Sequence, residues 1–135
     1  MESRVSNSLK TLEAMSVDAW RAREKAHIYG NTKVGCAVQA DDGQVYLGCN
    51  IEHRFRCHDI HAETNAISTM VTSGGQRIVA LLVVASTERF TPCGGCMDWI
   101  MELGGADCVV GFQAKPGGPI EMFRAGELMP RYPRI

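Results

Sequence analysis

The sequence lacks a long apolar run, an excess of one charge and a recognisable leader segment. Its longest uninterrupted apolar stretch, Ile78–Ala85, is too short to span a bilayer. The first residues contain no apolar core of the kind that a secretory signal needs. The formal net charge is −1, whereas nucleic-acid-binding surfaces normally carry a basic excess. We therefore expect neither a membrane nor a nucleic acid among its partners.

The chain has the length of one domain. With 135 residues it is long enough to bury a hydrophobic core, so we expect residues 1–135 to form a single catalytic domain. Six cysteines are present, but a domain of this size does not need disulfides for stability. We expect a cytoplasmic protein with reduced thiols, in which a Cys-x-x-Cys motif serves metal binding or redox chemistry.

The hydrophobic pattern predicts an α/β fold. Helices are expected over residues 6–27, 61–71, 93–103 and 125–129, and strands over 34–40, 44–49, 78–85, 108–112 and 120–123. A loop over residues 50–60 joins the second strand to the second helix. The continuous apolar, β-branched run at 78–85 indicates a central strand that is covered on both faces. This order of elements predicts a three-layer α-β-α fold around a mixed sheet of about five strands.

Two short motifs carry the chemistry, His61-Ala62-Glu63 and Pro92-Cys93-Gly94-Gly95-Cys96. Both are expected where the chain enters a helix. His61, Cys93 and Cys96 can supply a neutral imidazole and two thiolates to Zn²⁺, leaving the fourth coordination position open, as catalytic zinc sites do. Two thiolates neutralise the dication, and a neutral site makes a bound water more acidic than a three-cysteine site would.

Glu63 is predicted to be the catalytic acid–base residue, because it lies two residues after a metal ligand and can take and return a proton. A lone Cys-x-x-Cys fits redox or structural zinc use equally well, and His-Ala-Glu alone is a weak signal. The two motifs together favour catalytic zinc. Cys57 and His58 could instead close the site with four protein ligands, but Glu63 would then have no function, so we prefer the open site.

From about Tyr29 to Pro130 the chain resembles the cytidine deaminase family. The His-x-Glu…Pro-Cys-x-x-Cys pattern is a mark of zinc-dependent nucleobase deaminases. Three further segments match the family pattern, namely Val34-Gly35-Cys36-Ala37, Gly48-Cys49-Asn50-Ile51-Glu52-His53 and Glu127-Leu128-Met129-Pro130.

The resemblance implies zinc-dependent hydrolytic deamination of cytidine or deoxycytidine to the uridine form plus ammonia, as in pyrimidine salvage, with Glu63 moving the protons. It implies that Asn50 and Glu52 bind the sugar hydroxyls of a free nucleoside. It also implies that the Ala62 N–H and the Thr91 carbonyl contact the ring. Short members of the family are homo-oligomers, so a tetramer is expected in preference to a dimer.

Several residues depart from the family pattern. Thr64 replaces an arginine that offsets the charge of three-cysteine sites, which suits a histidine-ligated metal. Thr32 stands where an aromatic residue packs on the pyrimidine, and Arg56 stands where a tyrosine is usual. The C-terminal phenylalanine that covers the base is absent, with Tyr132 one position early. Arg54 and Arg56 either face a carboxylate on an unusual sugar or are solvated loop charges, and we prefer the second interpretation.

These departures keep two alternatives open. One is a deaminase of a modified aminopyrimidine nucleoside, such as an antibiotic resembling blasticidin S. The other lies outside the enzymes, and is a zinc-stabilised binding module whose metal has four protein ligands.

Overall fold

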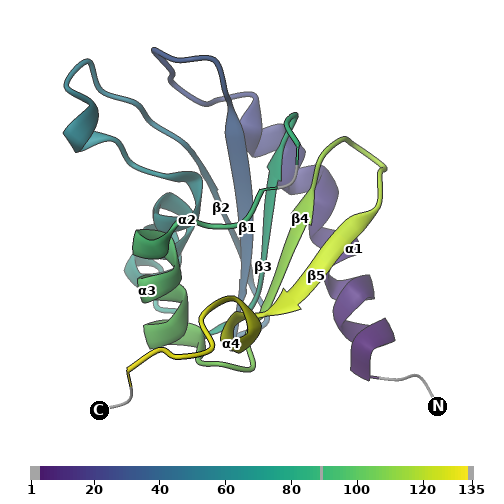
Figure 1. Ribbon diagram of the computed structural model, residues 1–135. Helices are drawn as coiled ribbons and strands as arrows, with labels where there is room; N and C mark the ends of the chain where they lie inside the picture. The colour runs from purple at the N-terminus through teal and green to yellow at the C-terminus, as the bar shows by residue number, and fades with distance from the viewer. Residues whose placement is uncertain (1–3, 89, 134–135) are drawn as a thin grey trace.

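A computed structural model describes residues 4–88 and 90–133 of the chain. Five strands form one mixed sheet in the order β2-β1-β3-β4-β5 (Figure 1). The strands are β1 (Val34–Ala40), β2 (Val45–Cys49), β3 (Ile78–Ala85), β4 (Val109–Gln113) and β5 (Ile120–Arg124). The helices are α1 (Arg4–Arg23), α2 (Ala62–Thr72), α3 (Gly94–Gly104) and α4 (Ala125–Leu128), with a 3₁₀ turn, η1 (Arg56–His58), before α2. The predicted α/β class and mixed five-stranded sheet are confirmed.

The helices cover the sheet on both faces, which gives the expected three layers. Helix α1 packs on one face, against β1, β2 and β3, whereas α2 packs on β1 and β2 and α3 packs on β3. Strand β3 lies between the two helical layers (Figure 1). Its residues alternate in direction, with Leu81 and Val83 in the core under α2 and α3, and Leu82 and Val84 in the core under α1. Burial on both faces explains the continuous apolar run.

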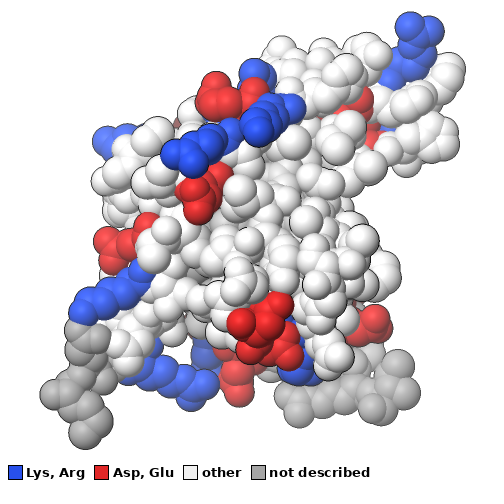
Figure 2. Space-filling model, turned by 180° about the vertical axis from the view of Figure 1, so that it is seen from behind, with Lys and Arg blue, Asp and Glu red and all other residues white. Residues whose placement is uncertain are grey.

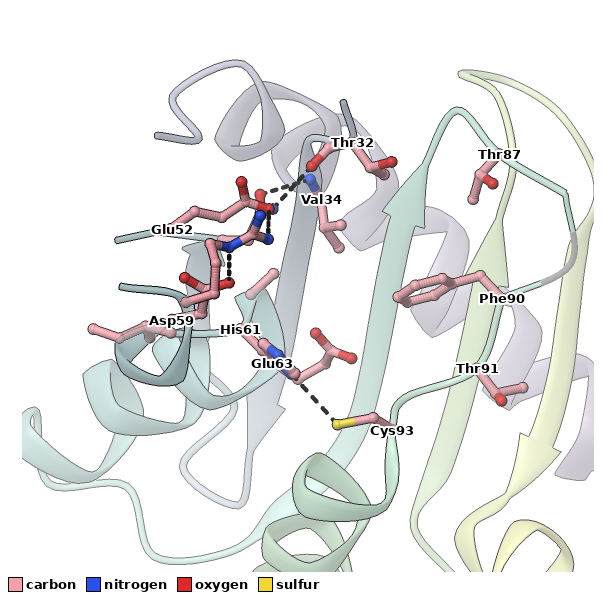
Figure 3. A pocket seen from close by; sticks show the side chains of 14 residues that line it. Thr32, Val34, Glu52, Asp59, His61, Glu63, Thr87, Phe90, Thr91 and Cys93 are labelled. Carbon is pink, nitrogen blue, oxygen red and sulfur yellow. Dashed lines mark hydrogen bonds and ion pairs between the residues drawn. The ribbon is translucent and has the colours of Figure 1, made fainter. Parts of the chain in front are cut away.

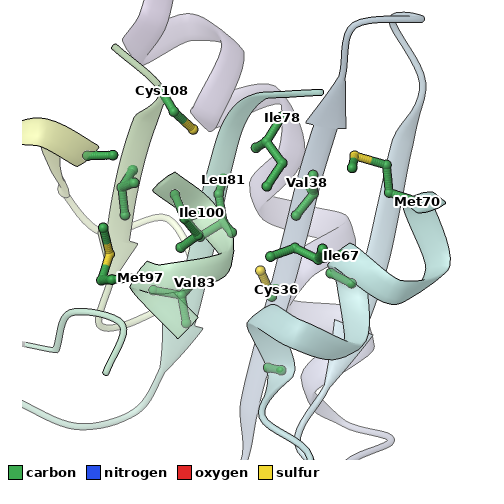
Figure 4. Close-up of a cluster of buried hydrophobic side chains, with 14 of the residues drawn as sticks. Cys36, Val38, Ile67, Met70, Ile78, Leu81, Val83, Met97, Ile100 and Cys108 are labelled. Carbon is green, nitrogen blue, oxygen red and sulfur yellow. The ribbon is translucent and has the colours of Figure 1, made fainter. Parts of the chain in front are cut away.

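The larger core fills the space between the sheet and helices α2 and α3. Ile67 and Met70 of α2 and Ile100 of α3 are buried there against side chains of β1 and β3 (Figure 4). Each helix thereby presents one apolar face to the sheet. This packing holds α2 and α3 in fixed positions on the same side of the sheet.

Strand direction brings the starts of α2 and α3 to one edge of the sheet. Strand β1 is antiparallel to both β2 and β3, so β2 and β3 run in the same direction. Strand β4 is parallel to β3, which requires the crossover that α3 provides. The chain leaving β2 toward α2 and the chain leaving β3 toward α3 therefore emerge at the same edge. The two predicted motifs lie at these two helix starts.

The first helix is shorter than predicted. We expected it to reach His27, but it ends at Arg23, and the following N–H groups bond to carbonyls three residues back. The His27 N–H donates to the Asn50 carbonyl, and the His27 carbonyl accepts the Glu52 N–H. Pairing with residues 50–52 thus replaces the last helical turn, which periodicity within the helix could not reveal.

No described helix combines the length and the apolar character that a membrane span would need. On the face seen in Figure 2, basic and acidic side chains are interspersed among uncharged ones, with no large patch of one sign.

Close packing of α2 on β2 predicts the effect of one substitution. A Cβ atom at Gly48 would overlap the Ala66 N and Ala62 O atoms of α2, so Gly48→Ala should push the helix from the sheet. Overpacking of this kind typically costs about 1–3 kcal/mol, and urea unfolding should show a loss in this range. Gly94→Ala is the control, because nothing lies within 4 Å of its Cβ position. Equal stability of the two variants would contradict this account of the packing.

Candidate active site

Three predicted metal ligands meet where α2 and α3 begin. His61 is the N-cap residue of α2 and Cys93 the N-cap residue of α3, with Cys96 in the first turn of α3. The His61 Nδ1 atom lies 3.3 Å from Cys96 Sγ and 3.4 Å from Cys93 Sγ. Tetrahedral zinc, with bonds of about 2.3 Å to sulfur and about 2.0 Å to nitrogen, sets such atoms about 3.5 Å apart. The donor set therefore fits a tetrahedral metal ion.

Cys57 and His58 do not join this cluster. Within the described part of the chain, His61, Cys93 and Cys96 form the one group of three or more donors that could hold a metal, all within 4.8 Å of one another. Cys57 and His58 lie in η1, and the His58 ring instead contacts the His53 ring at 5.1 Å. The closed site with four protein ligands finds no support in this arrangement.

The N-terminus of α3 alone does not stabilise the thiolate form of Cys96, which lies in the first turn of that helix. Burial raises the pKa of the Cys96 thiol, and the nearby Glu63 carboxylate and Cys93 raise it further. A helix N-terminus favours the thiolate, but desolvation of Cys96 outweighs that effect here. A bound dication would supply the missing stabilisation, since metal binding displaces thiol protons.

Glu63 is buried in the first turn of α2, with 2 % of its surface exposed. Burial raises the pKa of its carboxyl group. Figure 3 shows its side chain directed into the pocket, close to His61 and across from Cys93. A carboxyl group held beside a metal site and open to a pocket can exchange protons with a molecule bound there.

Two of the three candidate metal ligands, His61 and Cys93, line a pocket of about 330 Å³ (Figure 3). Its wall contains residues from the starts of β1, α2 and α3 and from the loops before them. Of the predicted site residues, Cys96 lies outside this wall and the other seven lie in it, namely Asn50, Glu52, His61, Ala62, Glu63, Thr91 and Cys93. Cavities of this size suit a small organic ligand.

Asn50 is a structural residue as well as a pocket residue. Its side-chain Oδ1 accepts the Val34 N–H at 2.8 Å, and its Nδ2 donates to the Thr32 carbonyl at 2.9 Å. Asn50 thereby fixes the start of β1 to the end of β2. An amide has two N–H donors and two acceptor positions, so one of each remains for a ligand.

Glu52 is held by its surroundings rather than free at the rim. Its Oε1 atom accepts the Tyr29 and Gly30 N–H groups, each at 2.8 Å. Its Oε2 atom lies 3.0 Å from Arg56 Nη2. The Gly30 and Tyr29 N–H groups and the Arg56 charge lower the pKa of this carboxyl group, so Glu52 is a carboxylate at neutral pH.

Arg56 is the clearest correction to the sequence analysis. We interpreted Arg54 and Arg56 as solvated loop charges, but Arg56 lines the pocket and pairs with Glu52 and with Asp59. Arg54 is exposed and lies outside the pocket wall. Neither arginine was assigned a role, and Asp59 was not singled out. The spacing of Glu52, Arg56 and Asp59 in the sequence is compatible with ion pairs. It brings the three side chains together only when the loop forms a helical turn.

Phe90 is a second pocket residue that the sequence analysis missed. Among the described residues that line the pocket, it is the sole phenylalanine, tyrosine or tryptophan. Its ring lies across the pocket from Glu63 and His61 (Figure 3) and contacts the Phe112 ring at 5.8 Å. The expected aromatic position, Thr32, lines the opposite wall.

Comparisons with known proteins show the family of the chain. Residues 9–112 match the family model of the cytidine and deoxycytidylate deaminase zinc-binding region. The chain belongs to this family. Cytidine deaminase from Sporosarcina psychrophila is 35 % identical over 121 residues, covering 88 % of each chain. Cytidine deaminase from Halalkalibacterium halodurans is 36 % identical over 115 residues, covering 84 % of this chain and 86 % of the relative.

Solved structures of cytidine deaminases share the fold. The enzyme from Burkholderia pseudomallei superposes with a TM-score of 0.80 at 33 % identity, covering 87 % of this chain and 95 % of that one. The enzyme from Mycobacterium tuberculosis gives a TM-score of 0.73 at 29 % identity, covering 90 % and 94 %. The family resemblance drawn from the motifs is confirmed over most of the chain.

Asn50 should contribute to stability independently of any ligand. Asn50→Ala would leave the Val34 N–H and the Thr32 carbonyl without their side-chain partner. Unsatisfied buried groups cost about 1–3 kcal/mol each, so chemical denaturation without ligand should show a loss of about 2 kcal/mol. Asn31→Ala, in the exposed turn before β1, is the matched control and should change stability little. If both variants were as stable as the parent protein, the structural role of Asn50 would be wrong.

Proposed function

We propose that this family member catalyses the zinc-dependent hydrolytic deamination of cytidine and deoxycytidine. Water supplies the oxygen that replaces the exocyclic amine, and the amine leaves as ammonia. One observation carries the proposal, namely that the His61, Cys93 and Cys96 cluster lies beside Glu63 in a pocket that also contains Asn50 and Glu52. We propose that the chain performs this reaction as a single domain, since every residue involved lies in the loops and helix starts along one edge of a single sheet.

His61, Cys93 and Cys96 would hold the zinc ion. Two thiolates and a neutral imidazole balance its charge, and the exposed sides of His61 and Cys93 leave room for a water as fourth ligand. When bound there, zinc makes that water acidic enough to lose a proton near neutral pH. The identity of the metal is proposed from the donor types and from the zinc-binding family to which the chain belongs.

Glu63 moves the protons of the reaction. Its carboxylate accepts one proton from water and delivers it to the ring nitrogen, and it then takes a second proton from the newly added hydroxyl group and delivers it to the departing amine. The side chain can do both because it points into the pocket from the first turn of α2 (Figure 3). Burial keeps bulk water from competing for the same proton positions.

The pocket offers polar groups for both parts of a nucleoside. The Ala62 N–H belongs to the first residue of α2 and has no acceptor four residues earlier within the helix, so it is available to the base. The Thr91 carbonyl, on the opposite wall, is suited to accept from the exocyclic amine. Asn50 and Glu52 lie together near the start of β1, where they would contact sugar hydroxyls.

Phe90 would provide the aromatic contact to the base. A pyrimidine has two flat faces that gain energy from packing against a ring, and Phe90 presents its ring on the wall across from His61 and Glu63 (Figure 3). Phe112 supports that ring from behind. Phe90 thus takes the place of the aromatic residue that is absent at Thr32.

The comparisons do not favour the two alternatives. The relatives and solved structures named above are all cytidine deaminases, and none bears the name of an antibiotic deaminase or of a zinc-binding module. We therefore prefer cytidine to a blasticidin S-like nucleoside as the substrate, and catalysis to a binding role as the function.

We also propose a homo-oligomer, with a tetramer preferred to a dimer. Large apolar side chains stay exposed on the loop before α2 and on helices α2 and α3, with Phe55 at 63 %, Val71 at 53 % and Trp99 at 51 %. Val71 and Trp99 border one groove between α2 and α3. Exposed apolar patches of this kind mark interaction surfaces.

Six free cysteines, two of them needed as metal ligands, suit the reducing cytoplasm as the proposed location.

Ammonia release tests the proposed reaction. The zinc-loaded protein should release ammonia from cytidine and deoxycytidine but not from cytosine, which lacks the sugar. Glu63→Gln should keep its zinc and lose about 10²-fold or more in turnover, because proton transfer contributes about 10²–10⁴-fold. His61→Ala is the control for metal loss and should lower the zinc content. Zinc-bound protein that releases no ammonia, or Glu63→Gln protein with full turnover, would refute the proposal.

Substitution of Phe90 tests the aromatic contact. Base–aromatic stacking is worth about 1–3 kcal/mol, so Phe90→Leu should raise KM for cytidine about tenfold with a smaller change in kcat. Phe90→Tyr keeps the ring and should stay close to the parent protein. Thermal unfolding of both variants separates an effect on packing against Phe112 from an effect on the substrate. An unchanged KM for Phe90→Leu would exclude the stacking role.

A further inference from the structure

We propose that Arg56 determines how the pocket recognises the sugar. Its guanidinium fixes Glu52 and occupies one acceptor position of that carboxylate, so that Glu52 keeps one position for a neutral hydroxyl group. The inference rests on the proposed function, since it assigns a specificity role within that site. In this role Arg56 is a positioning residue, because it acts on the sugar through Glu52.

Arg56 bridges two carboxylates in the same loop. Its Nη2 atom lies 3.0 Å from Glu52 Oε2, and its Nε atom lies 2.8 Å from Asp59 Oδ2. The Glu52 and Asp59 side chains are only 10 % and 15 % exposed, while Arg56 is half-exposed along the pocket wall. Figure 3 shows both contacts as dashed lines near the start of β1. Only arginine presents a planar fork that can bond in two directions at once.

Main-chain groups fix the other sides of both carboxylates. Tyr29 and Gly30 donate their N–H groups to Glu52 Oε1, and His53 donates its N–H to Asp59 Oδ1 at 2.8 Å. Arg56 therefore links two anchored points of the loop, and Glu52 has no other orientation that keeps these bonds. The carboxylate is oriented before any ligand arrives.

The hydrogen bonds of Glu52 limit what it can bind. A carboxylate has about four acceptor positions. The Tyr29 and Gly30 N–H groups use both positions on Oε1, and Arg56 uses one on Oε2. One acceptor remains. Asn50 retains one N–H donor beside it, because its other N–H bonds to the Thr32 carbonyl. Asn50 also retains one acceptor position on Oδ1, since the Val34 N–H uses the other. Glu52 can therefore accept from one hydroxyl group, which can in turn accept from the Asn50 N–H.

The local charge defines the class of sugar. Glu52 and Asp59 bring two negative charges against the one positive charge of Arg56, and Glu63 lies in the same pocket. A phosphate or carboxylate on the sugar would meet a net negative surface. The spare N–H groups of Arg56 therefore do not make an anion site. The charged hydrogen bond to Glu52 is therefore available to one hydroxyl of a neutral nucleoside, either the 2′- or the 3′-hydroxyl but not both.

Binding of the product tests this inference apart from catalysis. Calorimetry with zinc-loaded protein should show that removing one sugar hydroxyl of uridine weakens binding about tenfold or more, while removing the other changes it less than about threefold. Hydrogen bonds to charged groups are worth about 1.5–3 kcal/mol, which sets the larger factor. Uridine 5′-monophosphate should bind more weakly than uridine.

Arg56→Met keeps the length of the side chain and removes its charge and fork. It should weaken uridine binding about tenfold and reduce the difference in affinity between the two deoxy analogues of uridine. In turnover of cytidine, KM should rise while kcat changes less than about threefold. Arg56→Lys should recover only part of the affinity, since an ammonium group cannot bridge both carboxylates in one plane. Arg54→Met, an exposed position in the same loop, is the matched control and should behave as the parent protein.

The outcomes separate the two proposals. If cytidine yields no ammonia but uridine binding still depends on one hydroxyl and on Arg56, the deaminase proposal fails and the recognition proposal stands. Four results would each overturn the role of Arg56. They are an equal loss of affinity for both deoxy analogues, tight binding of the monophosphate, unchanged binding by the Arg56→Met protein, and the absence of uridine binding.

Discussion

The site depends on two helices that begin side by side above the same edge of the sheet. Because β2 and β3 run in the same direction, the chain segments that leave them enter α2 and α3 close together. His61 caps one helix and Cys93 the other, so ligands separated by a long stretch of sequence come within bonding distance of one ion. The apolar faces of both helices hold this arrangement against β1 and β3. A shift of either helix would separate the ligands.

The same edge also joins catalysis to recognition. Asn50 follows β2 and bonds to the first residue of β1, while the next residues pair with His27 and continue to His61. The loop from Asn50 to His61 thus begins with two pocket residues, Asn50 and Glu52, and ends with a candidate metal ligand. A substrate that contacts both ends spans one short, internally bonded segment, so binding and chemistry share the same rigid support.

Local patterns predicted most of the fold and most of the residues that the fold brings together in the pocket. The apolar run of β3 indicated a doubly covered strand, and the spacing of His61, Glu63 and the cysteines indicated a metal site. The pattern failed where contacts between distant segments decide the outcome. His27 leaves the helix because it pairs with residues 50–52, and Arg56 enters the pocket because the η1 turn directs it between two carboxylates. Phe90 faces the pocket because its loop passes the metal ligands, which no periodicity encodes.

The anchoring of Glu52 by main-chain N–H groups has an evolutionary consequence. Every non-proline residue carries the same N–H, so the turn at Tyr29 and Gly30 can hold the carboxylate whatever its side chains are. The Gly30 position even has room for a methyl group, whose nearest neighbour would be 3.5 Å away. Relatives can therefore diverge freely in this turn while preserving its function. Variation in the side chains of these two residues would therefore conceal a contact that is kept. Only a proline at either position would remove one of its hydrogen bonds, because proline has no N–H.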